Sequence, residues 1–238
     1  MKKKIMASLL VSSAVVGASL APLSAHAVTT GNTPVQAEFE AGVLPDQGDN
    51  TVGMGSVDPD PTQPNTDFDL VTIPRSFDFS PVKIGEDLTS IQAIFPSYET
   101  TRAVMVGDLR GTKEGWHVTG QLTKMNNEAD ELAGDINFGL EMNYAKHVTI
   151  PTVFYTVSPV LNGMNIADDP AAPSAIGTSI KIGGGATALM NATVGKGQGI
   201  WAGRFRNMTL NVTTPMQQLK KGAYTGNITW NLVAGPSI

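Results

Sequence analysis

Two tryptophans are the residues best suited to stack on a sugar. Trp116 and Trp230 each begin a short motif, Trp-His-Val in the first case and Trp-Asn-Leu in the second. In a strand, residues i and i+2 share a face, so Trp116 shares a face with Val118 and Trp230 with Leu232. Apolar faces of this kind normally point into a core. Two interpretations stay open: these four residues form structural core, or one indole is exposed in a ligand groove.

A second set of residues could contact a charged ligand or a partner. Asp108 and Arg110 come before a glycine turn at the end of a predicted strand, and Arg204 and Arg206 lie near Trp201. Arg can hold a carboxylate of a ligand through two hydrogen bonds. The alternatives are an ion pair or turn hydrogen bonds at Asp108, and a core Trp201 with solvated Arg neighbours.

The chain offers little for enzyme or metal chemistry. It has no Cys and three His, and it lacks the Gly-x-Ser-x-Gly motif of a nucleophile elbow. Acidic residues between Asp58 and Asp69 could bind calcium, but the spacing lacks the glycine and final Glu of an EF-hand. Acidic, Pro-rich segments usually remain solvated. We predict no catalysis, no bound metal and no cofactor.

Strands are the elements that would position these residues. Alternating or β-branched runs predict strands near residues 35–40, 101–106, 116–123, 136–144, 150–157, 201–212 and 224–232. The apolar face changes parity near Asn207, which predicts a β-bulge, and residues 126–132 could hold one helical turn. The pattern predicts an all-β fold, a single β-sandwich of Ig-like or Greek-key type with a long Pro/Asp/Gly-rich loop.

The N-terminal sequence predicts export. A basic start, an apolar stretch and Ala25-His26-Ala27 form the three parts of a signal peptide over residues 1–27. Residues 28–238 would form one domain, with residues 45–67 as an acidic Pro/Gly-rich loop or linker inside it. A lipid anchor would need a Cys, and no wall-sorting signal precedes the C-terminus. We expect a secreted, extracellular protein whose mature form has no membrane span.

The charge balance argues against nucleic-acid binding, because 21 acidic residues outnumber 16 basic ones. Residues 28–74 contain eight acidic residues and no Lys or Arg. Long-range attraction to anionic wall polymers is therefore not expected to drive binding.

Three stretches, taken in order, resemble the WxL domain of Gram-positive cell-surface proteins. They are Ile-Pro-Arg-Ser-Phe-Asp-Phe at residues 73–79, the segments at 106–112 and 115–118 with Asp-Leu-Arg-Gly-Thr and Gly-Trp-His-Val, and the terminal Tyr-Thr-Gly-Asn-Ile-Thr-Trp-Asn-Leu at 224–232. The first Trp motif ends in Val118 where the family has Leu, a conservative change on the same strand face.

The resemblance implies a function at the cell wall. It implies non-covalent binding of peptidoglycan or another wall polymer, and co-export with other WxL-type or surface proteins. The alternative is a structural or adhesive module in a complex with those proteins or with a host extracellular matrix glycoprotein.

Overall fold

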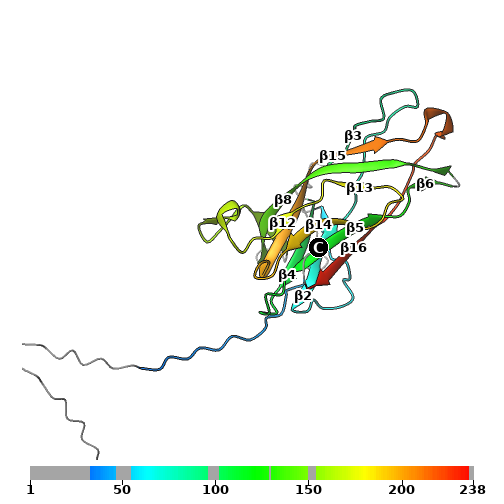
Figure 1. Cartoon of the computed structure of the whole chain (residues 1–238). Coiled ribbons are helices and arrows are strands. Elements are labelled where there is room, and N and C mark those ends of the chain that lie inside the picture. The colour runs from blue at the N-terminus through cyan, green and yellow to red at the C-terminus, as the bar shows by residue number, and fades with distance from the viewer. Residues whose placement is uncertain (1–32, 47–54, 96–101, 129, 150–153, 236–238) are drawn as a thin grey trace, which may run out of the picture. The chain divides into compact units, whose positions relative to one another are not determined.

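The computed structural model describes residues 33–46, 55–95, 102–128, 130–149 and 154–235 (Figure 1). The chain divides into two units, Met1–Glu38 and Phe39–Ile238, and all the strands belong to the second. The predicted signal peptide, residues 1–27, lies outside the described residues. In the described part of the chain, no helix has the length and apolar character needed to cross a membrane.

The larger of the two main sheets has eight antiparallel strands. They are β1 (Ser56–Val57), β2 (Phe68–Pro74), β3 (Ile91–Gln92), β4 (Ala103–Asp108), β8 (Gly134–Val148), β9 (Phe154–Ser158), β13 (Ser179–Lys181) and β15 (Gly199–Val212). Their order is β1-β2-β4-β15-β8-β13, with β3 beside β15 and β9 beside β8. The long strands β8 and β15 pair along most of their length and form its centre (Figure 1).

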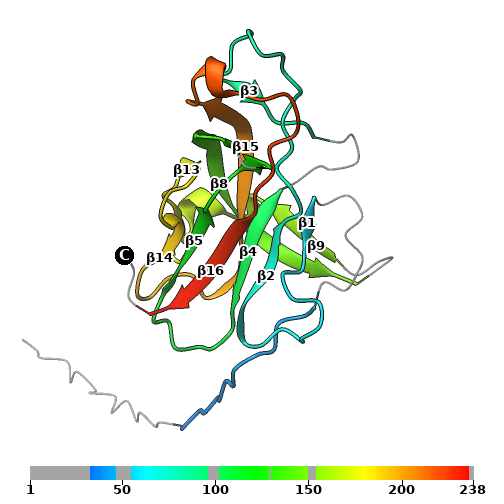
Figure 2. The same ribbon diagram turned by 90° about the vertical axis from the view of Figure 1, so that its right-hand side faces the viewer.

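The smaller sheet has four antiparallel strands in the order β12-β14-β5-β16. They are β5 (Trp116–Leu122), β12 (Ser174–Ala175), β14 (Thr187–Ala192) and β16 (Ile228–Ala234). Two short hairpins and two 3₁₀ helices complete the described elements: β6 (Asn126–Asn127) with β7 (Asp130–Glu131), β10 (Val160–Leu161) with β11 (Met164–Asn165), η1 (Ile166–Asp168) and η2 (Met216–Gln218). Strand β16 lies beside β5 at the margin of its sheet (Figure 2). It also contacts β2 of the larger sheet.

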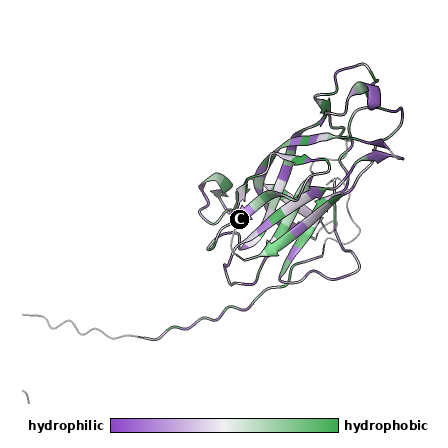
Figure 3. Ribbon diagram, turned by 45° about the vertical axis from the view of Figure 1, so that its right-hand side comes forward, coloured by the Kyte–Doolittle hydropathy of each residue, from purple (hydrophilic) through white to green (hydrophobic). Residues whose placement is uncertain are grey.

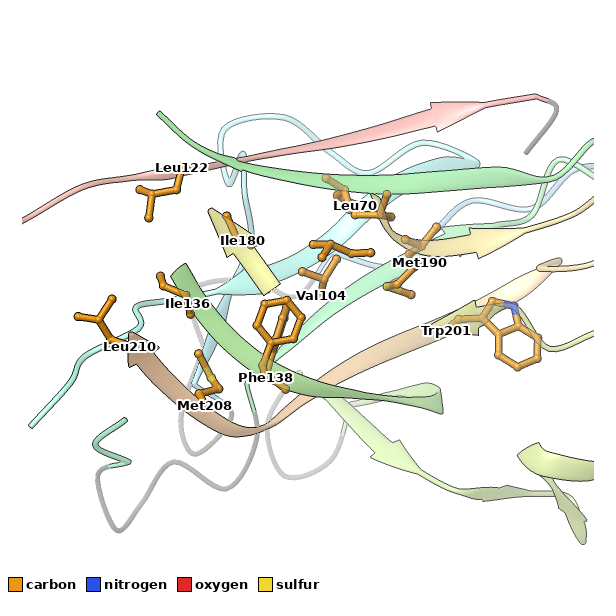
Figure 4. Close-up of a cluster of buried hydrophobic side chains, with 14 of the residues drawn as sticks. Leu70, Val104, Leu122, Ile136, Phe138, Ile180, Met190, Trp201, Met208 and Leu210 are labelled. Atoms are coloured by element: carbon orange, nitrogen blue, oxygen red, sulfur yellow. The ribbon is translucent and has the colours of Figure 1, made fainter. Parts of the chain in front are cut away.

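Both sheets contribute to one apolar core, and apolar and polar residues are interspersed along their ribbons (Figure 3). The strand β5 alternates between the core and the outer face, whereas β4 is buried along its whole length. Leu122 and Met190 of the smaller sheet are buried with Val104 and Phe138 of the larger one (Figure 4). A second cluster contains Ala103 and Met105 of β4, which alternate along the strand with Val104 and Val106 of the first cluster. This second cluster therefore lies on the other face of the larger sheet.

The all-β prediction is confirmed, whereas the single β-sandwich of Ig-like or Greek-key type stays a prediction. The residues of β5 alternate strictly between buried and half-buried, as their sequence pattern predicts. The bulge near Asn207 is also confirmed. The pairing of β15 with β8 shifts register between Arg206 and Thr209, and Asn207 has a positive φ of 49°.

Two local predictions are wrong. Residues 35–40 alternate like a strand, but they are exposed and form no strand, since no other described strand pairs with them. Alternation alone cannot supply the hydrogen-bonding neighbour that a strand needs. Where residues 126–132 could hold a helical turn, Asn126–Asn127 and Asp130–Glu131 instead pair as the antiparallel strands β6 and β7, and Glu128 has a φ of 53°, outside the right-handed helical region.

The domain boundaries and the 45–67 loop or linker stay predictions, and residues 47–54 lie outside the described part. The described ends of this segment contact the domain. The Asn65 side chain donates a hydrogen bond to the Pro45 carbonyl at 3.0 Å, and Tyr155 donates its hydroxyl to the same oxygen. Ser56 is fully buried and exchanges hydrogen bonds with the backbone of Ala103 at 3.1 Å.

Candidate functional site

A groove of about 370 Å³ lies between two segments that are far apart in the sequence. One wall is Ile73–Phe79, which begins at the end of β2, and the other is Tyr224–Trp230, which leads into β16. The walls combine aromatic or aliphatic side chains with polar ones: Phe77, Met125, Tyr224, Ile228 and Trp230 on the one hand, and Arg75, Ser76, Asp78 and Asn227 on the other. Such a mixture suits a ligand with both apolar and polar parts.

Trp230 is half-buried in this groove. It pairs across the sheet with Gly120 of β5, where a Cβ atom would come within 3.3 Å of the indole. The ring also packs edge-to-face against two phenylalanines: its centroid lies 6.3 Å from Phe77 and 5.9 Å from Phe205. Trp230 therefore joins the wall of the groove to the core.

Trp116 has a different environment. It is fully buried, and its indole Nε1 donates a hydrogen bond to the Gly197 carbonyl at 3.0 Å. Val118, two residues along the same strand, is fully buried too, while Leu232 beside Trp230 is half-buried. The Trp116 motif therefore lies in the core. The Trp230 motif lies at the border between the core and the groove.

Asp108 and Arg110 form a compact ion pair. The Asp108 side chain is 1% exposed and the Arg110 side chain 12%. The Arg110 Nη2 and Nε atoms donate to the two carboxylate oxygens at 2.8 and 3.0 Å, and Arg110 also pairs with Glu114. The guanidinium covers the Phe68 ring at 3.6 Å, and its hydrogen bond to Asp108 raises the Arg110 pKa. These contacts describe a clamp for the turn before Trp116.

Trp201 and the two arginines near it do not form one surface patch. The Trp201 ring is 3% exposed, packs on Tyr144 with centroids 5.2 Å apart, and donates from Nε1 to the Gln198 carbonyl. Arg206 pairs with Glu141 at 2.9 Å, at a partly exposed position. Burial lowers the pKa of Arg204, which is half-buried.

Residues 26–236 match the family of WxL domains, which is described as surface cell wall-binding. The chain belongs to the WxL domain family. No curated protein and no solved structure gave a significant match. A function in cell-wall binding at the cell surface follows from the family, and the partner is a component of the wall.

The geometry assigns the three motif stretches of this WxL domain to two places. The first and third stretches, residues 73–79 and 224–232, form the two sides of the groove. The middle stretch forms the Asp108–Arg110 clamp and the core strand β5. Sequence reasoning did not single out Arg75, Phe77, Asp78 or Asn227, although their membership in the motif stretches was a signal for them.

A second groove, of about 610 Å³, adjoins the first and shares six lining residues with it: Phe77, Asp78, Phe79, Met125, Tyr224 and Thr225. The remaining wall is mainly aliphatic and includes Val82, Ile84 and Leu88, of which the first two are 40% and 51% exposed. Among the residues that the structure describes, no group of three or more His, Cys, Asp or Glu could hold a metal ion. The predictions of no metal, no cofactor and no catalysis stay predictions.

Proposed function

We propose that this WxL domain is a secreted protein of a Gram-positive bacterium that binds peptidoglycan without a covalent bond. The observation that carries the proposal is the groove between residues 73–79 and 224–230. It is formed by two motif stretches of a family that binds the cell wall. A motif that served only the core would not need to border an open cleft.

The arrangement supports binding in preference to catalysis. Among the described residues that line the groove, Asp78 supplies the one carboxylate, and its side chain is 63% exposed. Glycoside hydrolysis requires a pair of carboxyl groups on either side of the scissile bond. We expect the protein to leave the wall material uncleaved, and release of soluble fragments from purified wall would contradict this.

A pull-down with purified sacculi tests the proposed function. Chain lacking residues 1–27 should sediment with sacculi and remain bound when the salt concentration rises, because charge attraction is screened by salt and is not the expected driving force. If the chain fails to sediment with sacculi at every ionic strength tested, low salt included, the proposal is overturned.

The second groove favours one alternative function, an interaction or adhesive module in a complex with co-exported surface proteins or a host matrix glycoprotein. Its aliphatic wall, with Val82 and Ile84 exposed, suits an apolar protein segment better than a sugar. Under this alternative, sacculi would retain the chain only when such a partner is added.

A further inference from the structure

The free edge of β16 borders the groove. In the order β12-β14-β5-β16, β16 pairs with β5 on one side, and no other strand among the described residues pairs with it. An antiparallel strand at the margin of a sheet directs the N–H and C=O groups of alternate residues away from its partner. These outward groups can bond to an added extended chain.

The register identifies the residues whose backbone groups point outward. The Gly235 N–H donates to the Gly115 carbonyl at 3.2 Å, which makes these two a hydrogen-bonded pair just beyond the strand end. The pairing from Ile228–Leu122 to Ala234–Trp116 continues without a register shift. Odd-numbered residues of β16 therefore bond to β5, and the even-numbered residues point outward: Ile228, Trp230, Leu232 and Ala234.

An independent hydrogen bond supports this assignment. Leu122 lies opposite Ile228, and its carbonyl accepts from the Gly183 N–H at 2.9 Å, on the side away from β16. The Leu122–Ile228 pair is thus the non-hydrogen-bonded type. Two of the outward residues, Ile228 and Trp230, also line the groove with their side chains.

The indole rings are poorly placed for a sugar. Trp116 is fully buried and Trp201 is 3% exposed. Trp230 is half-buried between Phe77, Phe205 and the backbone of Gly120. Stacking on a pyranose needs an open aromatic face, and within the described part of the chain no indole offers one.

We infer that this site binds the peptide stem of the wall polymer, as an extended chain along the β16 edge, and not the glycan strand. The inference rests on the proposed function, since it names the component of peptidoglycan that the groove holds. A stem peptide carries the amide groups that an open strand edge recognises, whereas a glycan strand has no backbone amides in register. It also carries carboxylates, and the groove wall includes Arg75, an exposed residue of the type that pairs with carboxylates.

Three wall preparations test the inference with the chain lacking residues 1–27. Intact sacculi should retain it, and glycan strands stripped of peptide by an amidase should retain at least ten-fold less. A synthetic stem peptide should compete, and a peptide-free glycan oligomer should not. Equal retention by stripped glycan would overturn the inference and leave the proposed function standing. Retention by neither preparation would overturn both.

Amide hydrogen exchange tests the edge directly. With the stem peptide added, the amides of Trp230 and Leu232 should exchange at least ten-fold more slowly, while those of Thr229 and Asn231 should change little. Unchanged exchange at Trp230 and Leu232 in the peptide-saturated protein would overturn the inference. Slow exchange there in the free protein, together with a concentration-dependent dimer, would assign the edge to a second copy and also overturn it.

A proline variant provides a matched comparison. Ile228→Pro removes an outward N–H, which an edge strand tolerates, and Ile228→Ala loses a similar side chain but keeps that N–H. We expect Ile228→Pro to bind the stem peptide at least five-fold more weakly than Ile228→Ala. Equal affinity of two folded variants would contradict a backbone contact at this position. If Ile228→Pro does not fold, the exchange measurement on the unmodified chain decides.

Discussion

Strands β5 and β16 are neighbours in one sheet and each carries a Trp motif, yet their surroundings differ. In β5 the Trp116 ring is enclosed, hydrogen-bonded to Gly197 and flanked by strands on both sides. In β16 the Trp230 ring is half-buried, and one edge of the strand, next to a groove, pairs with no strand of the described residues. A tryptophan on a central strand must serve the fold, whereas one on a border strand can serve the fold and a ligand together.

The largest expected effect is at Trp116. Trp116→Ala should lower the free energy of unfolding by about 3–5 kcal/mol, because it leaves a large cavity and an unpaired carbonyl at Gly197. Urea denaturation measures the change. A loss below about 1 kcal/mol would mean that Trp116 is not the core residue that the comparison requires.

The turn before β5 should come next. Arg110→Ala leaves the Asp108 carboxylate buried without its charge partner, and loss of one member of a buried pair costs about 3 kcal/mol. Urea denaturation of this variant should show that loss. The double variant with Asp108→Asn should recover part of the stability. If its loss of stability equals the sum of the losses in the two single variants, the two side chains do not interact and the clamp is contradicted.

Trp230 should matter less to the fold than Trp116. Trp230→Ala should lower the free energy of unfolding by about 2 kcal/mol. The ring is only half-buried, so its removal loses less buried apolar surface than removal of the Trp116 ring. Thermal unfolding of both variants side by side gives the comparison. A loss at Trp230 equal to that at Trp116 would remove the distinction between the two strands.

The smallest effect should be on the outer face of β16. The side chain of Asn231 is exposed, so Asn231→Ala should change the free energy of unfolding by less than about 0.5 kcal/mol. Its backbone bonds to β5 remain in place. Denaturation and sacculus binding should both match the unmodified chain. Weaker binding would show that the wall polymer contacts the outer face of β16 and not its edge.

Much of this difference could be predicted from the sequence, but its decisive part could not. Alternation in 116–122 and 228–232 correctly gives the strands and the inward faces of both motifs. It does not give strand order, because β16 becomes a border strand only through pairings over long sequence distances. The groove escaped prediction for the same reason, since its two walls are about 150 residues apart in the chain.

The residues that the sequence offered for contact with a charged ligand or partner illustrate a second limit. The residue types at Asp108, Arg110 and Trp201 suit a ligand, but burial of Asp108 and Trp201 directs their polar groups to internal partners. Composition cannot reveal burial of an individual side chain. The exposed residues 35–40 are the converse case, in which apolar and polar residues alternate but no strand of the described residues pairs with them.

Sacculus binding by Trp230→Ala shows whether the wall is bound in the groove beside β16, with Asn231→Ala as the folded control on the same strand. Both variants should be folded at the assay temperature, which circular dichroism verifies. We expect retention of Trp230→Ala on sacculi to fall at least ten-fold while Asn231→Ala binds like the unmodified chain. Unmodified retention of a folded Trp230→Ala variant would contradict the claim that the groove beside β16 is where the wall is bound.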